Sequence, residues 1–421
     1  MPRTAAWWTR VPGGRDGRRM LWIALVDRIG SGLWASVSVL YFTYVSDLSV
    51  AQVGALVAVS GAVGIAGAPL GGRIADRLPL TRVLAALQIL RALASVALLT
   101  TDDYFLLMAF SAVGSLGDRA ANVLTKLYAT RVAGPDRVRY QAVNRTVANA
   151  GWALGGLAAA GALAVGTTAA YRSLLLGDAL SFAAVALLTT RCGEPPSATR
   201  TVTTSKNPAP TERPRSPWRD RAYLTYVASD TVLFLDDAVF KVGLPLWIAH
   251  SDHAPHGLAP LLMVLNNVMV VVFQVPLAHF GATTAAARAL LIPLSAVFAL
   301  GGTAMALSAT GGAVTTTSFL TGAAIAFTVA EMLHATVSWE LSVALAPDTA
   351  QGAYLGVHGL AQSAQRSVGP LAVTAAIAVG PLGWTAFGAT IAMTCLFQHR
   401  IVRERLPRPA LSVPPVTVSE H

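Results

Sequence analysis

The stretch Pro69–Val83, PLGGRIADRLPLTRV, gathers Arg73, Asp76, Arg77 and Arg82 between two long apolar runs. Elsewhere the chain is sparing with charge, because 54% of its 421 residues are hydrophobic and only 12% are charged. Soluble domains carry about 25% charged residues. We therefore interpret the chain as an integral membrane protein and this stretch as a tight loop between two membrane-spanning helices.

Apolar segments long enough to cross a bilayer recur along the whole chain. A spanning helix needs about 20 largely apolar residues. The predicted spans are residues 20–45, 49–71, 81–100, 103–126, 146–166, 171–190, 222–249, 257–279, 286–308, 311–335, 354–379 and 381–399. We expect an all-α integral membrane fold with twelve transmembrane helices in two six-helix bundles.

A polar segment separates the two sets of spans. Residues 191–221 are rich in Pro, Ser and Thr, which predicts a flexible linker. The expected parts are therefore an N-terminal bundle at residues 20–190, this linker, and a C-terminal bundle at residues 222–400. Short tails at residues 1–19 and 401–421 flank the two bundles.

Lysine and arginine gather on one side of the predicted membrane. They fill the tails, the linker, the opening stretch and the loop between spans four and five, which we take to include Lys126 and Arg145. Loops on the other side carry Asp47, Asp102 and Asp103. The positive-inside rule then predicts a multi-pass protein of the inner (cytoplasmic) cell membrane with both termini in the cytoplasm. The net charge of +10 becomes a topology signal, so no nucleic-acid partner is expected. The Arg-rich start before a long apolar run does not fit a cleaved signal peptide.

Cysteine usage and motifs narrow the chemistry. Cys192 and Cys395 stand without metal-ligand spacing, so we expect no bound metal or cofactor. The phosphate-binding G-x-x-x-x-G-K-[ST], H-E-x-x-H and G-x-S-x-G motifs are absent, which argues against an enzyme and against ATP-driven transport. A membrane-embedded enzyme or a sensor remains the alternative class.

Two spans of the first half carry a polar face at helical spacing. In span one this face comprises Asp27, Ser31, Trp34, Ser38 and Tyr41, with Arg28 adjacent. In span four it comprises Ser111, Ser115, Asp118, Asn122 and Thr125, with Arg119 adjacent. Ionisable side chains are costly inside a membrane. We interpret these faces as walls of a water-accessible cavity; the alternative is a salt bridge that only holds helices together.

The second half repeats this habit less regularly. Its cavity candidates are Asp230, Phe234, Asp236, Asp237, Lys241, Asn266, Asn267, Glu331, His334, Tyr354, His358, Gln362, Gln365 and Arg366. Polarity therefore concentrates on spans one, four, seven and ten, together with span eleven. Carboxylates in a cavity suit a proton carrier, which makes Asp27, Asp118, Glu331 and His334 the candidates for proton coupling.

Asp27 and Asp118 are expected at similar depths in the membrane. The helix rise places Asp27 about 10 Å inside from the cytoplasmic end, and Asp118 about 22 Å along span four, which enters from the other side. We therefore expect the neighbouring pairs Asp27-Arg28 and Asp118-Arg119 to meet and pair crosswise.

The run NAGWALGG in span five places small residues at close-packing spacing. Gly151 and Gly155 are four residues apart, and Gly156 follows. Such spacing lets two helices approach closely. We expect tight packing of this span, with a pivot between conformations as the functional interpretation.

The two halves, the linker and the stretch GGRIADRLPLTR together resemble the major facilitator superfamily. The signature of that family in this loop has the form G-x-[L/I]-A-D-R-x-G-R-[K/R]. The matching residues are Gly72, Ile74, Ala75, Asp76, Arg77 and Arg82. Pro79 and Leu80 stand where the central Gly-Arg of the signature would be.

This resemblance implies a secondary transporter that works by alternating access, with one substrate cavity between the halves lined by spans one, four, seven and ten. It also implies a conformational latch at Gly72, Asp76, Arg77 and Arg82, in which Asp76 closes the cytoplasmic face of the outward-open state. Asp76 would then cap a helix of the opposite half. An arginine of span four would assist, and Arg119 is the nearest candidate.

Two further similarities bear on the type of transporter. A span-five antiporter signature, G-x-x-x-G-P-x-x-G-G, matches in part, with Trp152 at its proline. The stretch Ala330–Leu360 is similar to multidrug-efflux-type members. We therefore expect a proton-coupled exporter of a small amphipathic organic compound, acting as a monomer on protons and one small-molecule substrate within the lipid bilayer. The alternative is a proton-coupled importer of a small nutrient.

Overall fold

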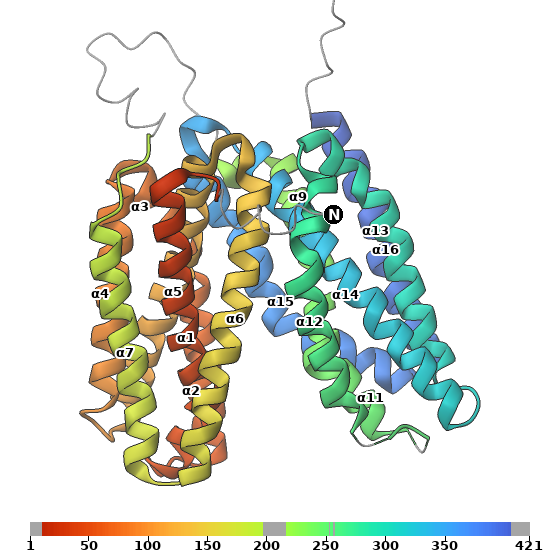
Figure 1. Cartoon of the computed structure of the whole chain (residues 1–421), viewed down its shortest axis with the longest axis horizontal. Coiled ribbons are helices and arrows are strands. Elements are labelled where there is room, and N and C mark those ends of the chain that lie inside the picture. The colour runs from red at the N-terminus through yellow and green to blue at the C-terminus, as the bar shows by residue number, and fades with distance from the viewer. Residues whose placement is uncertain (1–10, 197–215, 252, 256, 406–421) are drawn as a thin grey trace, which may run out of the picture.

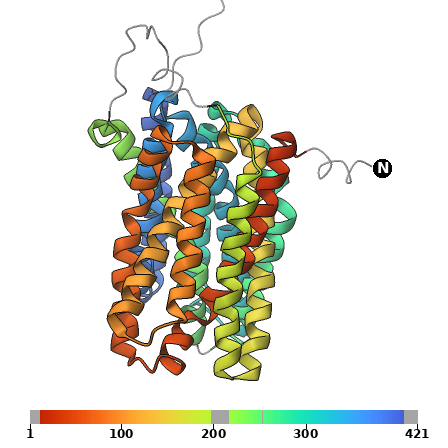
Figure 2. The ribbon, with the colours of Figure 1, turned by 90° about the vertical axis from the view of Figure 1, so that its left-hand side faces the viewer.

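The computed structural model describes residues 11–196, 216–251, 253–255 and 257–405. Most of the predicted linker and of both predicted tails lies outside these residues. Within them the chain forms helices and no strands. The helices gather into two bundles that stand side by side (Figures 1 and 2).

The helices of the N-terminal bundle run from Gly14 to Thr190. They are α1 (Gly14–Tyr44), α2 (Val50–Ile65), α3 (Gly67–Arg77), α4 (Leu80–Leu98), α5 (Tyr104–Ala133), α6 (Arg137–Val165) and α7 (Thr168–Thr190). The N-terminal bundle contains six membrane-spanning segments when α2 and α3 are counted as one.

The helices of the C-terminal bundle run from Arg221 to Arg405. They are α9 (Arg221–Leu233), α10 (Asp236–Ala238), α11 (Leu244–Ala249), α12 (Leu258–Ala278), α13 (Thr284–Leu307), α14 (Ala313–Ala344), α15 (Gln351–Val379) and α16 (Pro381–Arg405). A turn of π-helix, Val239–Gly243, joins α10 to α11. With α9 to α11 counted as one broken span, this bundle also crosses six times, which confirms the predicted fold class.

Length and apolar character alone identify fewer spans. Within the described residues, seven helical segments pass that test, or eight with the bent pair Gly14–Ala35 and Val37–Tyr44. One of the seven, Tyr104–Val165, contains both α5 and α6. The span α9–α11 is broken into short helices, and neither α15 nor α16 passes the test of length and apolar character.

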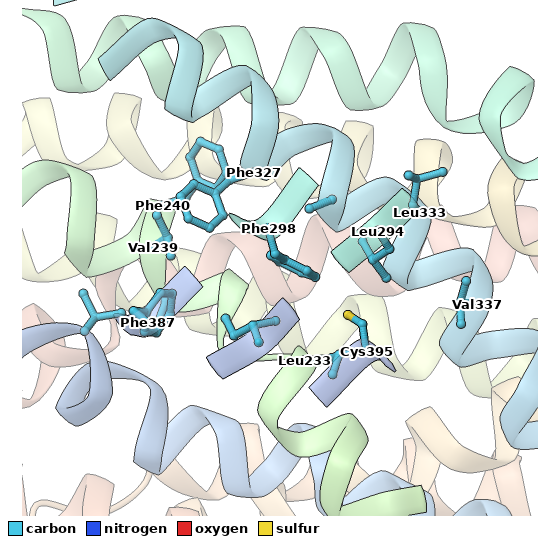
Figure 3. Close-up of a cluster of buried hydrophobic side chains, with 14 of the residues drawn as sticks. Leu233, Val239, Phe240, Leu294, Phe298, Phe327, Leu333, Val337, Phe387 and Cys395 are labelled. Carbon is cyan, nitrogen blue, oxygen red and sulfur yellow. The ribbon is translucent and has the colours of Figure 1, made fainter. Parts of the chain in front are cut away.

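Each bundle has its own apolar core. In the C-terminal bundle Leu233, Phe298, Phe327 and Cys395 meet between α9, α13, α14 and α16 (Figure 3). The core of the N-terminal bundle also includes Trp339, which belongs to α14 of the other bundle. A separate apolar cluster, formed by Val138 and Ala142 of α6 with Ala278 of α12, also joins the two bundles.

The bundles touch at the end where α1 begins and α16 ends, which we call the terminal end. There α3 packs against α15, with Gly72 against Gly352. Arg137 of α6 makes a bidentate ion pair with Glu340 of α14, at 2.7 and 2.6 Å. At the opposite end of the molecule, the ribbons of the two bundles diverge (Figure 1).

The loop between α3 and α4 has an unusual anchor. Pro79 occupies the N-cap position of α4 and offers no side-chain cap. Glu194, which follows α7, accepts hydrogen bonds from the backbone N–H groups of Leu80 (2.7 Å) and Thr81 (2.9 Å). It also accepts from the Thr81 hydroxyl at 2.6 Å. The Pro79-Leu80 departure from the family signature therefore coincides with a cap supplied from another part of the chain.

Glu194→Ala is expected to lower the free energy of unfolding by about 1 kcal/mol, because α4 loses its N-terminal cap. Equilibrium unfolding in mixed detergent micelles measures this change. Glu404→Ala removes an exposed carboxylate of α16 and serves as the control. Equal effects of the two substitutions would show that Glu194 does not act as a cap.

Candidate functional site

Two cavities lie between the bundles, and a third lies mainly within the N-terminal bundle. The central cavity, of about 410 Å³, is lined by both bundles. The inner cavity, of about 250 Å³, adjoins it on the side of the terminal end and shares Arg28, Asn122 and Gln362 with it. The third, the N-bundle cavity, has a volume of about 380 Å³.

Most of the predicted cavity residues line these spaces. The central cavity contains Asp27, Arg28, Asn122, Phe234, Asp236, Asp237, Lys241, Glu331, His334, Gln362, Gln365 and Arg366. The inner cavity adds Arg119 and His358. The N-bundle cavity adds Ser31, Trp34, Ser38, Ser115 and Asp118.

The other predicted cavity residues line none of the three. Tyr41 is buried, and its hydroxyl donates to the carbonyl of Leu98 at 3.3 Å. Tyr354 donates to Asp220 at the terminal end, at 3.0 Å. Asn267 is exposed and donates to the carbonyl of its own helix neighbour Met263. Asn266 donates to the carboxylate of Glu331, and Asp230 is the centre of a buried cluster; both are described below.

A buried arginine of α4 organises the acids of the first bundle. Arg91 Nη1 donates to Asp27 Oδ1 at 2.7 Å, and Nη2 donates to Asp118 Oδ1 at 3.1 Å. Nη1 also donates to Gln88 at 2.8 Å. The guanidinium group lies 3.8 Å from the ring centroid of Phe182. One cation thus holds two carboxylates from two other helices.

The predicted crosswise pairing of these acids is wrong. Arg28 Nη2 donates to Asn122 Oδ1 at 2.5 Å, and Arg119 Nη1 donates to Ser363 at 2.9 Å. The depth argument placed Asp27 and Asp118 at one level but overlooked Arg91. That side chain enters between them from a third helix and reaches both.

Glu331 of α14 is bound from both bundles. Arg145 of α6 forms an ion pair with its Oε1 atom, across the boundary between the halves. Asn266 of α12 donates to its Oε2 atom at 2.9 Å and to Thr328 at 3.1 Å. Arg145 looked like part of the positive loop in the sequence, but α6 begins at Arg137 and carries it two turns into the helix.

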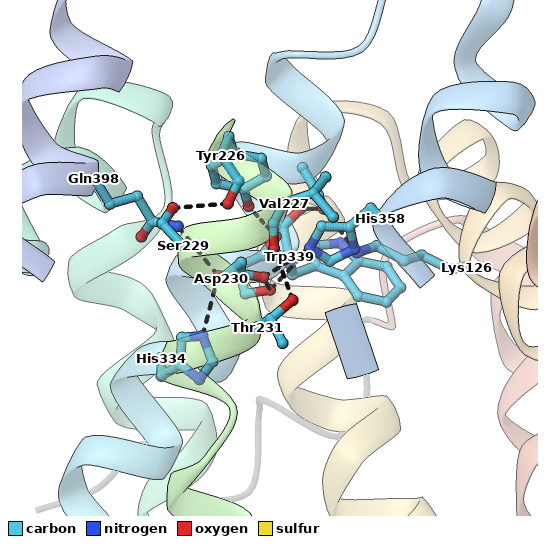
Figure 4. Close-up of polar contacts among 12 residues, drawn as sticks. Lys126, Tyr226, Val227, Ser229, Asp230, Thr231, His334, Trp339, His358 and Gln398 are labelled. Atoms are coloured by element: carbon cyan, nitrogen blue, oxygen red, sulfur yellow. Dashed lines mark hydrogen bonds and ion pairs between the residues drawn. The ribbon is translucent and has the colours of Figure 1, made fainter. Parts of the chain in front are cut away.

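Asp230 of α9 is the centre of a second buried cluster (Figure 4). Its side chain is 0% exposed. The hydroxyl of Ser338 donates to Oδ2 at 2.7 Å, and the amide of Gln398 donates to Oδ1 at 3.3 Å. His334 Nε2 lies 3.2 Å from Oδ1, and His358 Nε2 lies 2.8 Å from Oδ2. The structure thus unites three residues that the sequence placed in three separate spans.

Lys126 of α5 reaches from the first bundle to the edge of this cluster (Figure 4). Its Nζ atom donates to Ser342 of α14 at 2.7 Å. It also lies 4.8 Å from the ring centroid of Trp339. Sequence reasoning counted Lys126 as part of the positive loop and did not connect it with the second bundle.

Asp76 contacts the first residues of α15. Its two carboxylate oxygens accept from the backbone N–H groups of Gly352 (2.9 Å) and Ala353 (2.8 Å). The positive end of the helix dipole favours a carboxylate at this position. Arg131, and not Arg119 as predicted, is the arginine of span four nearest to it, at 3.8 Å. Arg77 and Arg82 are exposed.

The glycines of span five bring α6 against α1. A Cβ atom on Gly151 would lie 2.8 Å from the Arg28 Cβ atom. A Cβ atom on Gly155 would lie 2.3 Å from the carbonyl oxygen of Ile29. Gly156 lies beside Gly32, because a Cβ atom on Gly32 would be 3.4 Å from the backbone nitrogen of Gly156. The close approach positions Arg28 at the cavity wall.

Sequence reasoning missed several residues of these clusters. They are Gln88, Arg91, Lys126, Arg145, Asp178 and Ser338. Arg91 and Asp178 did carry a signal, since each is a charged residue inside an apolar run. Asp178 is buried beside the Arg91 cluster and accepts from Ser95 at 3.1 Å.

Known proteins share this architecture. A family model described as the Major Facilitator Superfamily matches residues 20–370. A bacterial homologue of the iron transporter ferroportin, in an outward-facing state, is 14% identical with a TM-score of 0.69, covering 93% of this chain and 99% of that chain. The proton:xylose symporter XylE is 14% identical with a TM-score of 0.64, covering 92% and 96%. The human organic anion transporter MFSD10 (TETRAN) is 12% identical with a TM-score of 0.57, covering 93% and 100%. No curated protein sequence matches the chain.

Proposed function

The chain belongs to the Major Facilitator Superfamily, and on that premise we propose that it is a proton-coupled secondary transporter that exports a small amphipathic organic compound. The Arg145–Glu331 ion pair carries this proposal, because it joins the two bundles at the wall of the central cavity. Such a bond links the charge of a cavity carboxylate to the arrangement of the halves.

The terminal end corresponds to the cytoplasmic face in this proposal. The bundles are in contact there and diverge at the other end, so the described conformation is outward-facing. Asp76 on the N-terminus of α15 acts as the latch of this state, and its contacts with Gly352 and Ala353 must break when the cytoplasmic face opens. Alternating access then exposes the central cavity to one side of the membrane at a time.

Proton binding favours the change of conformation through Glu331. A neutral Glu331 attracts Arg145 far less strongly than the carboxylate does, because protonation removes the negative charge and with it the Coulomb attraction to the guanidinium group. Asp27, Asp118 and His334 are the other proposed proton carriers. Asp27 and Asp118 share Arg91, so protonation of one leaves the arginine to the other.

The central cavity fits a small compound with both polar and apolar parts. Trp152 and Phe234 offer aromatic surface on opposite bundles. Charged side chains of both signs surround them, with Asp236 and Asp237 on one bundle and Arg28 on the other. This lining supports an amphipathic substrate.

Wild-type protein in liposomes with an acidic lumen is expected to accumulate an amphipathic cation such as tetraphenylphosphonium or ethidium. Glu331→Gln should abolish accumulation driven by the pH gradient and retain exchange down a substrate gradient, because the glutamine remains neutral in every state. Uptake of radiolabelled or fluorescent cation measures both activities.

Glu404→Gln, on the exposed end of α16, is the matched control and should behave like the wild type. Wild-type uptake that ignores the pH gradient would contradict proton coupling. Accumulation driven by a gradient of the opposite sign would indicate the importer instead.

A further inference from the structure

We propose that Asp230, His334 and His358 form a proton relay that connects the central cavity with the inner cavity. This inference rests on the proposed proton coupling and assigns a route for the proton. The relay would run through the core of the second bundle and would use a carboxylate other than Asp27, Asp118 and Glu331.

The two histidines contact different oxygens of the same carboxylate. His334 lies against Oδ1 and His358 lies against Oδ2 (Figure 4). His334 is part of the wall of the central cavity, whereas His358 is part of the wall of the inner cavity. Asp230 itself is 0% exposed, so the histidines are its links to the two spaces.

Two neutral donors hold the carboxylate between the rings. Ser338 donates to Oδ2, and Gln398 donates to Oδ1. Buried carboxylates require such partners, but a purely structural acid would not require two imidazoles. Histidine is the side chain that gains and loses a proton near neutral pH, and each imidazole offers a second nitrogen on the far side from Asp230.

One proton enters and one leaves, and no bond between heavy atoms changes. A proton binds the Nδ1 atom of His334 from the central cavity, and the Nε2 proton of that ring passes to Oδ1 of Asp230. A half-turn of the carboxyl group brings the protonated oxygen to His358. Nε2 of His358 takes the proton, and its Nδ1 atom releases one toward the inner cavity. His334 and His358 end as the opposite tautomers, and the return of each to its first tautomer resets the relay.

Charged side chains lie at both ends of the relay. Asp236 of α10 and Arg145 of α6 line the central cavity together with His334, so charges of both signs are present at this end of the relay. Lys126 of α5 lines the inner cavity together with His358 and places a positive charge at the other end of the relay. The other titratable groups in this core are Tyr223 and Tyr226 of α9 and Cys395 of α16, and side chains of these types are ordinarily uncharged at neutral pH.

Lys126 gives the relay its connection to the conformational change. It belongs to the first bundle, but its contacts with Ser342 and Trp339 are on the second. Separation of the bundles at the terminal end breaks these contacts and withdraws the positive charge from His358. The proton affinity of the exit therefore depends on which side of the membrane is open.

Two measurements test the relay, one with a transported substrate and one without. In the liposome assay, His334→Gln and His358→Gln are each expected to lose accumulation of tetraphenylphosphonium driven by the pH gradient while keeping exchange down a substrate gradient. His399→Gln is the matched control, since His399 of α16 contacts the carbonyl of Arg288 instead. Full accumulation by His358→Gln would overturn the relay.

A second measurement needs no transported substrate. Full-length protein with ¹⁵N-labelled histidine in lipid nanodiscs should show the resonances of His334 and His358 titrating together. His358→Gln should shift the titration midpoint of His334, and Asp230→Asn should remove the coupling between the two rings. Independent titration of the two rings in the wild type would overturn the relay. Wild-type uptake that ignores the pH gradient would instead contradict the proposed function, and the spectra would still decide the relay.

Discussion

Arg91→Met is expected to lower the free energy of unfolding by about 3–5 kcal/mol, the usual cost of removing one partner from a buried ion pair. Arg91 is buried, and Asp27 and Asp118 both depend on it. Methionine fills a similar volume but leaves both carboxylates without their cation. Equilibrium unfolding in mixed detergent micelles, with far-UV circular dichroism as the signal, measures the loss.

Arg73→Met is the matched control for this substitution. Arg73 is exposed on α3, so the same chemical change should cost less than about 0.5 kcal/mol there. The double substitution Arg91→Met with Asp27→Asn should recover part of the lost stability, because one of the two stranded charges is gone. A loss below about 1 kcal/mol in Arg91→Met would show that the cluster is hydrated rather than held by the arginine.

Hydropathy predicted the apolar parts of the spans better than their charged ends. The predicted span 103–126 corresponds to α5, which continues to Ala133, and the predicted span 146–166 corresponds to α6, which begins at Arg137. Both differences lie at the terminal end. A search for apolar residues stops at the first charged residues, whereas the helix continues through them. The part it missed carries Arg131 and Arg137, two of the cations near the contact between the bundles.

Periodicity predicted which faces of the helices line the cavities but not which side chains pair. Asp27 and Asp118 lie on polar faces, as their spacing indicated, yet the partner of both comes from α4. Spacing within one helix says nothing about the rotation and depth of its neighbours. Asp230 shows the same limit, because its spacing indicated a cavity wall and the structure encloses it between its own helix and three others, α14, α15 and α16.

Gly72→Val is expected to shift the protein toward a conformation that is open at the terminal end. A Cβ atom on Gly72 would lie 2.1 Å from the carbonyl oxygen of Gly352 and 2.8 Å from its carbonyl carbon. Both are backbone atoms of the opposite bundle, so no rotamer change relieves the overlap. The bundles must separate at this point, and Asp76 then loses its short contact with the Gly352 N–H group.

Overpacking of this kind costs about 1–3 kcal/mol, and the cost falls only on the conformation in which α3 touches α15. A difference of that size changes the ratio of two conformations roughly 5- to 150-fold. Spin labels placed on the terminal ends of α3 and α15 measure the change as a longer distance between the bundles. Transport should fall in parallel, because the conformation in which the bundles touch at the terminal end becomes rare.

Gly54→Val is the matched control, since a Cβ atom there meets nothing within 4 Å. The same substitution on α2 should leave both the distance distribution and transport unchanged, which separates steric pressure from any general effect of valine in the helix. An unchanged distance in Gly72→Val would mean that α3 bends to accommodate the side chain. The contact between Gly72 and Gly352 would then be a consequence of the closed arrangement and not one of its causes.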